Sequence, residues 1–133
     1  MYKGDVAPSD AYEQIEADPK AVLLDVRTVP EWNFVGIPAV ARLLRVEWQQ
    51  YPTMDVNAGF VQAVIDAGVE KDAPVFALCR SGVRSIAAAE ALTAAGFENA
   101  YNVLDGFEGG KDNEGHRGLV GGWKASGLPW QQG

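Results

Sequence analysis

Continuously apolar runs alternate with amphipathic stretches along the chain. Two runs, AVLLDV at 21–26 and APVFAL at 73–78, are apolar at nearly every position, as strands buried on both faces of a parallel sheet are. Elsewhere, apolar residues recur at helical spacing. The pattern predicts helices at 8–17, 57–69 and 84–96 and a last strand at 99–106. Strands that alternate with helices indicate an α/β domain with a mainly parallel sheet.

The ends of the predicted helices carry residues that commonly start or stop a helix. Ser9 or Asp10 is expected to cap the first helix, because a short polar side chain can accept a hydrogen bond from its free N–H groups. Gly68 and Gly96 are expected to end the second and third helices.

Other stretches are less regular. Proline and glycine interrupt residues 27–40, so the pattern there predicts a loop with at most one helical turn near 31–34. The stretch ARLLRVEW at 41–48 fits a strand or a helix. Residues 1–110 are expected to form the domain, and the glycine-rich residues 111–133 a loop and tail held on it by tryptophans.

Composition narrows the class of protein. With 133 residues, 47% hydrophobic and 22% charged, the chain fits one globular domain, and it has no continuous apolar segment that would span a membrane. The N-terminus is acidic and polar, unlike a secretory signal. A single cysteine excludes an internal disulfide and a zinc site built on cysteine pairs, and it agrees with a cytoplasmic location. The net charge of −7 argues against a nucleic-acid partner.

The single cysteine lies in the segment FALCRSGVRS at 76–85. Cys79 falls between the strand that ends near Leu78 and the helix that starts near Arg84, and binding sites of parallel sheets lie at such junctions. Gly82 lets the backbone curl so that N–H groups point inward as a cradle for an anion. The helix N-terminus and two arginines favour a thiolate, so the pattern predicts a nucleophile. The alternative is that Cys79 is a small buried hydrophobe.

Three motifs together resemble one known family. LLDVRTVPEW at 23–32, CRSGVRS at 79–85 and GFENAYNVLDGFEG at 96–109 are similar to single-domain rhodaneses, the thiosulfate:cyanide sulfurtransferase-like family. The resemblance implies a three-layer α/β fold with a mainly parallel central sheet flanked by helices, and no cofactor. It also implies a persulfide on Cys79, loaded by thiosulfate or a persulfide donor. The acceptor would be cyanide, a small thiol or a partner protein.

The loop from Cys79 to Arg84 has six residues. This length resembles that of the corresponding loop in rhodanese sulfurtransferases. Related phosphatases have one residue more in this loop, because a phosphate group needs a wider ring of backbone amides than a single sulfur atom does. By this resemblance Arg84 orients the loop and adds positive charge, and Arg80 at the rim suits the sulfonate of a donor. The other residues expected to bind substrate are Ser81, Gly82 and Val83. Ser85 is a supporting residue or a cap of the next helix.

Asp25, Arg27 and Glu31 match the first motif of the family. We expect Asp25 and Arg27 to support the loop by ion pairing without a chemical role, and Glu31 to be structural. The histidine that many members carry after this motif is absent, because the chain reads VGIPAV there. His116 is the only histidine, and its glycine-rich surroundings indicate an inert surface residue.

Two other functions remain as alternatives. One is a module that senses sulfide or binds a protein without turnover, although an intact cysteine and arginine loop argues against it. The other is a small phosphatase, which the length of the loop disfavours. No metal site is expected.

Overall fold

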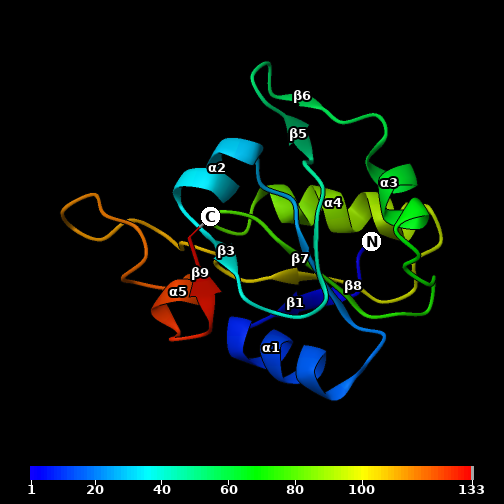
Figure 1. The fold of residues 1–133 in the computed structure, drawn as a ribbon, viewed down its shortest axis with the longest axis horizontal. Coiled ribbons are helices and arrows are strands. Elements are labelled where there is room, and N and C mark those ends of the chain that lie inside the picture. The colour runs from blue at the N-terminus through cyan, green and yellow to red at the C-terminus, as the bar shows by residue number, and fades with distance from the viewer. Residues whose placement is uncertain (133) are drawn as a thin grey trace.

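The computed structural model describes residues 1–132, and its centre is a sheet of five parallel strands in the order β1-β8-β7-β2-β4 (Figure 1). The strands are β1 (Gly4–Val6), β2 (Val22–Asp25), β4 (Leu43–Arg45), β7 (Val75–Leu78) and β8 (Ala100–Val103). Four-residue strands β2 and β7 lie at the centre of the sheet and are the two apolar runs predicted from the pattern. Their carboxyl ends therefore lie side by side, with Asp25 opposite Leu78.

Helices cover both faces of the sheet, which gives three layers. On one face lie α3 (Phe60–Asp66) and α4 (Arg84–Ala94), and on the other α1 (Pro8–Ala17) and the short α5 (Gly122–Ala125) (Figure 1). Side chains of β7 alternate between these two cores, as strand geometry requires. Cys79 belongs to the core beneath α3 and α4. The predicted three-layer α/β class is confirmed.

The helices occur where the pattern predicts them, with differences at their ends. The first spans 8–17 as predicted, but neither Ser9 nor Asp10 caps it: Ala7 is the cap residue, makes no side-chain hydrogen bond, and is followed by Pro8. Proline fits the first helical position because its missing N–H would have no partner there. Gly68 follows α3 and Gly96 follows α4, with φ of 88° and 100°, a left-handed conformation that favours glycine.

The ambiguous stretches contain regular structure. Residues 41–48 include strand β4, while 27–40 include helix α2 (Val29–Phe34) and strand β3 (Ile37–Pro38), which is more than the single turn expected. Helix α2 starts with a capping box in which the backbone N–H and hydroxyl of Thr28 bond to Glu31. This box explains how a proline-containing segment starts a helix.

Short elements complete the fold. A hairpin of β5 (Gln49–Gln50) and β6 (Asp55–Val56) projects from the body above α2 and α4 (Figure 1). The strand at 99–106 is not the last, because β9 (Trp130–Gln131) pairs antiparallel with β3. Trp123 of α5 is fully buried, and its indole N–H donates to the carbonyl of Pro129 at 2.8 Å. No helix within residues 1–132 combines the length and apolar character needed to cross a bilayer.

Candidate active site

The cysteine loop connects the end of β7 to the start of α4. Cys79 follows the last residue of β7, and its side chain is 1% exposed. The backbone N–H of Gly82 donates to the Sγ of Cys79 at 3.1 Å. Gly82 has φ of 97°, and a Cβ at this position would lie 3.1 Å from the backbone nitrogen of Asp105. Glycine therefore allows the turn that points an amide at the sulfur.

The loop that follows β8 packs against the cysteine loop and holds its backbone in place. The N–H of Phe107 donates to the carbonyl of Cys79 at 2.8 Å, and the N–H of Glu108 donates to the carbonyl of Arg80 at 2.9 Å. Gly106, with φ of 58°, lies so close that a Cβ there would be 2.3 Å from the carbonyl oxygen of Cys79. Gly106 and Phe107 of the third motif therefore fix the backbone at Cys79, where the cysteine loop begins. This structural role was not among the expectations from the sequence.

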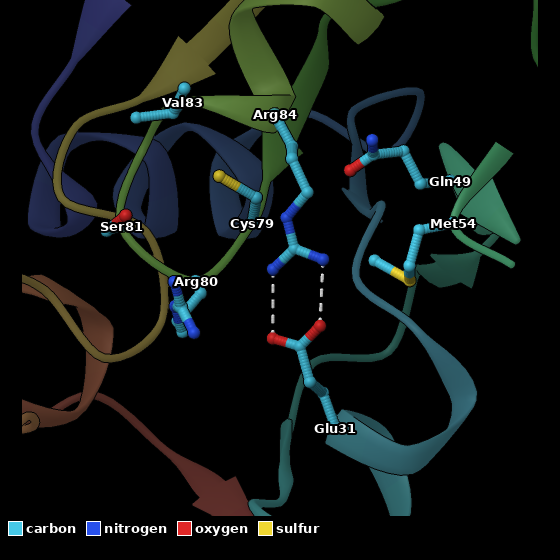
Figure 2. A pocket seen from close by; sticks show the side chains of 8 residues that line it. All are labelled: Glu31, Gln49, Met54, Cys79, Arg80, Ser81, Val83 and Arg84. Atoms are coloured by element: carbon cyan, nitrogen blue, oxygen red, sulfur yellow. Dashed lines mark hydrogen bonds and ion pairs between the residues drawn. The ribbon is translucent and has the colours of Figure 1, made fainter. Parts of the chain in front are cut away.

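A pocket of about 420 Å³ lies between the cysteine loop and the side chains of Glu31, Gln49 and Met54 (Figure 2). Its lining residues are Glu31, Gln49, Met54, Cys79, Arg80, Ser81, Val83 and Arg84. The structure thus brings five of the predicted site residues to one cavity, and Gly82 contributes its N–H to the sulfur in the same loop. Gln49 and Met54 come from the β5–β6 hairpin, which the sequence pattern did not predict.

Glu31 and Arg84 form a bidentate ion pair across this pocket. The two guanidinium nitrogens of Arg84 lie 2.8 and 2.9 Å from the carboxylate oxygens of Glu31, as Figure 2 shows. Their side chains are only 18% and 19% exposed. Burial opposes the charge on both groups, but the hydrogen bonds and attraction between them outweigh it: the pKa of Glu31 lies below its usual value and the pKa of Arg84 above its own. Arg84 is therefore held by a partner from α2.

This pairing predicts that Glu31→Gln destabilises the fold by about 1–2 kcal/mol at neutral pH, because a charge-assisted hydrogen bond is replaced by a weaker one. The lowered pKa of Glu31 sets the pH dependence of this effect. The contribution of Glu31 to the free energy of unfolding is complete above the usual carboxyl pKa of 4.5, and it is lost as the pH falls through the lower pKa that Glu31 has in the folded protein. Urea unfolding at a series of pH values measures the difference between the two proteins. Glu13→Gln, at an exposed acid of α1, is the control. A difference that stays constant down to acid pH would contradict the prediction.

Asp25 and Arg27 form the buried ion pair that the sequence predicts, and both are fully buried. The Nε and Nη2 atoms of Arg27 donate to the two carboxylate oxygens of Asp25 at 2.9 and 2.7 Å, and Nη2 also donates to the carbonyl of Gly36 at 2.8 Å. The guanidinium lies 4.3 Å from the centre of the Phe107 ring, whose backbone N–H binds the carbonyl of Cys79. The pair therefore touches the loop through Phe107 and does not line the pocket.

Ser85 is fully buried and does not cap α4. The cap residue is Val83, which makes no side-chain hydrogen bond. The Oγ of Ser85 lies 3.2 Å from the Sγ of Cys79 and donates to the Oδ1 of Asn102 in β8 at 2.5 Å. The expectation of a cap is wrong because this part of α4 faces the sheet. The sequence held one sign of this contact: Asn102 is a polar residue in an otherwise apolar strand, and a buried polar side chain needs a hydrogen-bond partner.

His116 lies on an exposed loop and does not line the pocket, and its Nδ1 is 4.0 Å from a carboxylate oxygen of Glu114. Within residues 1–132, no group of three or more histidine, cysteine or acidic side chains is arranged to hold a metal ion.

The three-layer α/β fold carries its cysteine loop at the carboxyl end of a central parallel strand, and comparisons with known proteins identify the family that has this arrangement. The sequence matches the family described as STR4 middle domain over residues 3–133. The crystal structure of Rv0390 from M. tuberculosis is 48% identical, superposes with a TM-score of 0.89 and covers 100% of both chains. The chain belongs to the rhodanese-like family.

Curated relatives and a further solved structure align with most of this chain. The uncharacterized protein RP600 homolog of Rickettsia rickettsii is 37% identical over 129 residues, which is 95% of each chain. The thiosulfate sulfurtransferase GlpE of Actinobacillus succinogenes is 27% identical over 127 residues, covering 96% of this chain and 89% of that protein. A polysulfide-sulfur transferase from Wolinella succinogenes shares the fold, with a TM-score of 0.68 and 23% identity over 97% of this chain and 78% of its own.

Proposed function

We propose that this protein is a sulfurtransferase that moves sulfane sulfur from thiosulfate or a persulfide donor to a thiophilic acceptor through a persulfide on Cys79. The observation that supports it most is the setting of the Cys79 sulfur. It accepts the N–H of Gly82 at 3.1 Å, and the residue shares with Arg80 and Arg84 a pocket large enough for a small anion. The proposal places the protein in the cytoplasm, where a lone thiol stays reduced.

The reaction has two displacement steps. In the first, the Cys79 thiolate attacks the outer sulfur of thiosulfate, a new S–S bond forms, and sulfite leaves with the electron pair of the broken S–S bond. In the second, cyanide attacks the outer sulfur of the persulfide, thiocyanate leaves, and the thiolate is restored. Both steps conserve charge and require no oxidant, reductant or cofactor.

The side chains of the pocket suit a donor with one anionic end. Arg80 is exposed at the pocket and makes no ion pair in the structure of residues 1–132, so its guanidinium can bind a sulfonate. Arg84 is shared with Glu31, whose carboxylate places negative charge on the opposite wall. Thiosulfate has to present only its outer sulfur to the loop, whereas a phosphomonoester has to place a whole tetrahedral group within the ring of amides. The six-residue loop therefore favours a sulfur donor over a phosphate.

The acceptor has to be external. The chain contains one cysteine, so the persulfide cannot be resolved by a disulfide within the same molecule. Cyanide, a small thiol or a partner protein with a thiol or other soft nucleophile would remove the sulfur.

Electrospray mass spectrometry of the purified protein tests the proposal. Incubation with thiosulfate should add the mass of one sulfur atom to each chain, and cyanide should remove it with release of an equal amount of thiocyanate. Repeated addition of both substrates should give many thiocyanate molecules per chain. Loading without repeated turnover would instead support the sensing or binding module, and no gain of mass would contradict a persulfide carrier.

A further inference from the structure

A chain of hydrogen bonds connects the buried cysteine to the exposed edge strand of the sheet. The Oγ of Ser85 lies 3.2 Å from the Sγ of Cys79 and 2.5 Å from the Oδ1 of Asn102. The Nδ2 of Asn102 donates to the Oδ1 of Asp5 at 3.0 Å, and the hydroxyl of Tyr2 donates to the same oxygen at 2.8 Å. Asp5 is exposed on β1, two strands away from β7, whose end carries the cysteine (Figure 1).

The chemistry of the side chains fixes the direction of each bond. A carboxylate can only accept, so the amide nitrogen of Asn102 has to face Asp5 and its oxygen has to face Ser85. Ser85 has a single hydroxyl proton, and it donates that proton to the amide oxygen. Toward the sulfur of Cys79, Ser85 can therefore present only lone pairs. An amide does not pass protons on, so the chain orients groups and does not conduct protons.

This orientation distinguishes the two protonation states of the cysteine. A thiol can donate its proton to the Oγ of Ser85, whereas a thiolate meets the lone pairs of the same oxygen at 3.2 Å. To donate to the thiolate, Ser85 has to give up its bond to Asn102 and leave a buried amide oxygen without a partner, which is costly. In a persulfide the charge lies on the outer sulfur, so the bond between Ser85 and Asn102 stays intact.

We propose that Asp5 and Asn102 are positioning residues that hold Ser85 as a hydrogen-bond acceptor toward the sulfur of Cys79. Ser85 then opposes the stabilisation that the loop N–H and the arginines give to a thiolate, and so it moderates the reactivity of the sulfur. Asp5 and Asn102 act through Ser85 and touch no substrate. The proposal goes beyond sulfur transfer, because it concerns the reactivity of the thiol whatever group the thiol attacks. The test of this proposal can fail even if sulfur transfer is demonstrated. It can also succeed if the protein transfers no sulfur.

Other residues with charged side chains lie around the cysteine loop and could also act on this thiol. They come from the cysteine loop and α4, from α2, from the end of β2 and from the loop after β8, and they are Arg80, Arg84, Glu31, Asp25 and Asp105. All of them are unchanged in the variants proposed below. Differences between those variants and the unchanged protein therefore report on the hydrogen-bond chain.

Asp5→Ala tests the proposal from the exposed end of the chain. Without the carboxylate, the amide of Asn102 can turn its nitrogen toward Ser85, and the hydroxyl of Ser85 can then donate to the sulfur. We expect the rate of iodoacetamide alkylation of Cys79 near pH 7 to rise about fivefold, the effect of one ordinary hydrogen bond. At a pH where the thiol is fully ionised, the rate should be unchanged. The ratio of the two rates is the measurement.

Two comparisons separate orientation from general loosening of the structure. Tyr2→Phe removes a donor to Asp5 but keeps the carboxylate, and Glu13→Ala removes an exposed acid of α1, so both should leave the ratio unchanged. In a Ser85→Ala background, Asp5→Ala should have no further effect on the ratio. An equal rise at both pH values in Asp5→Ala would indicate loosening and overturn the proposal, as would no change or a persistent effect in the Ser85→Ala background.

Asn102→Leu extends the test to the middle of the chain. Leucine has nearly the shape of asparagine and suits the buried position in β8, and it frees the Ser85 hydroxyl in the same way. The same rise near pH 7 is expected. If this buried variant fails to fold, Asp5→Ala decides alone, because its side chain is exposed.

Discussion

Cys79→Ser should abolish both the gain of one sulfur atom from thiosulfate and the release of thiocyanate. Cys79 is the only cysteine of the chain, and a serine oxygen at this position cannot form the S–S bond that carries the sulfur. The fold should survive, because serine is close in size and its oxygen can still accept the N–H of Gly82. Mass spectrometry measures the loading, and circular dichroism with a thermal melt checks the fold.

Cys79→Ala is the matched variant, since it removes the sulfur without placing another polar atom beneath the loop. Both variants should be inactive. Thiocyanate release near that of the unchanged protein, with an unchanged dichroism spectrum, would contradict the role of Cys79. Loading that survives in both variants would place the sulfur elsewhere in the molecule.

The central strands and main helices could be predicted because each carries a pattern of its own. β2 and β7 are buried on both faces, so they are continuous apolar runs. β1 is different: it has three residues at the edge of the sheet, Asp5 among them is exposed, and pairing with β8 decides its conformation. The same holds for β5 and β6, which have two residues each and are stabilised by each other. Such elements depend on their partners and leave little trace in the local pattern.

The cysteine loop could be predicted for a similar reason, because its residues are consecutive. Its surroundings could not. Gln49 and Met54 reach the pocket from a hairpin about thirty residues earlier in the chain, and Glu31 reaches Arg84 from α2. Spacing along the chain does not reveal such contacts. Ser85 shows the limit most clearly: the first turn of a helix suits a capping serine, but here the sheet lies beneath that turn, and Ser85 bonds to Asn102.

Arg84→Ala should reduce the rate of persulfide loading by about 10- to 100-fold, the effect of losing a charge-assisted hydrogen bond or its equivalent in charge. Removal of the guanidinium leaves the carboxylate of Glu31, 19% exposed, on the wall of the pocket without its partner. An anionic donor then meets uncompensated negative charge. Arg84→Lys keeps the positive charge but loses the bidentate geometry, so its rate should lie between those of the other two proteins. Stopped incubation with thiosulfate followed by mass spectrometry gives the rates.

The double variant Arg84→Ala with Glu31→Gln separates two roles of the arginine. If Arg84 acts mainly by neutralising Glu31, removing both charges should restore much of the rate, and added salt should help the single variant more than the double one. If the guanidinium itself binds the donor, the double variant should remain slow. The structure favours the first result, because both guanidinium nitrogens that face Glu31 are occupied by its carboxylate, while Arg80 is the exposed cation of the same pocket. Loading by Arg84→Ala at the rate of the unchanged protein would exclude both roles.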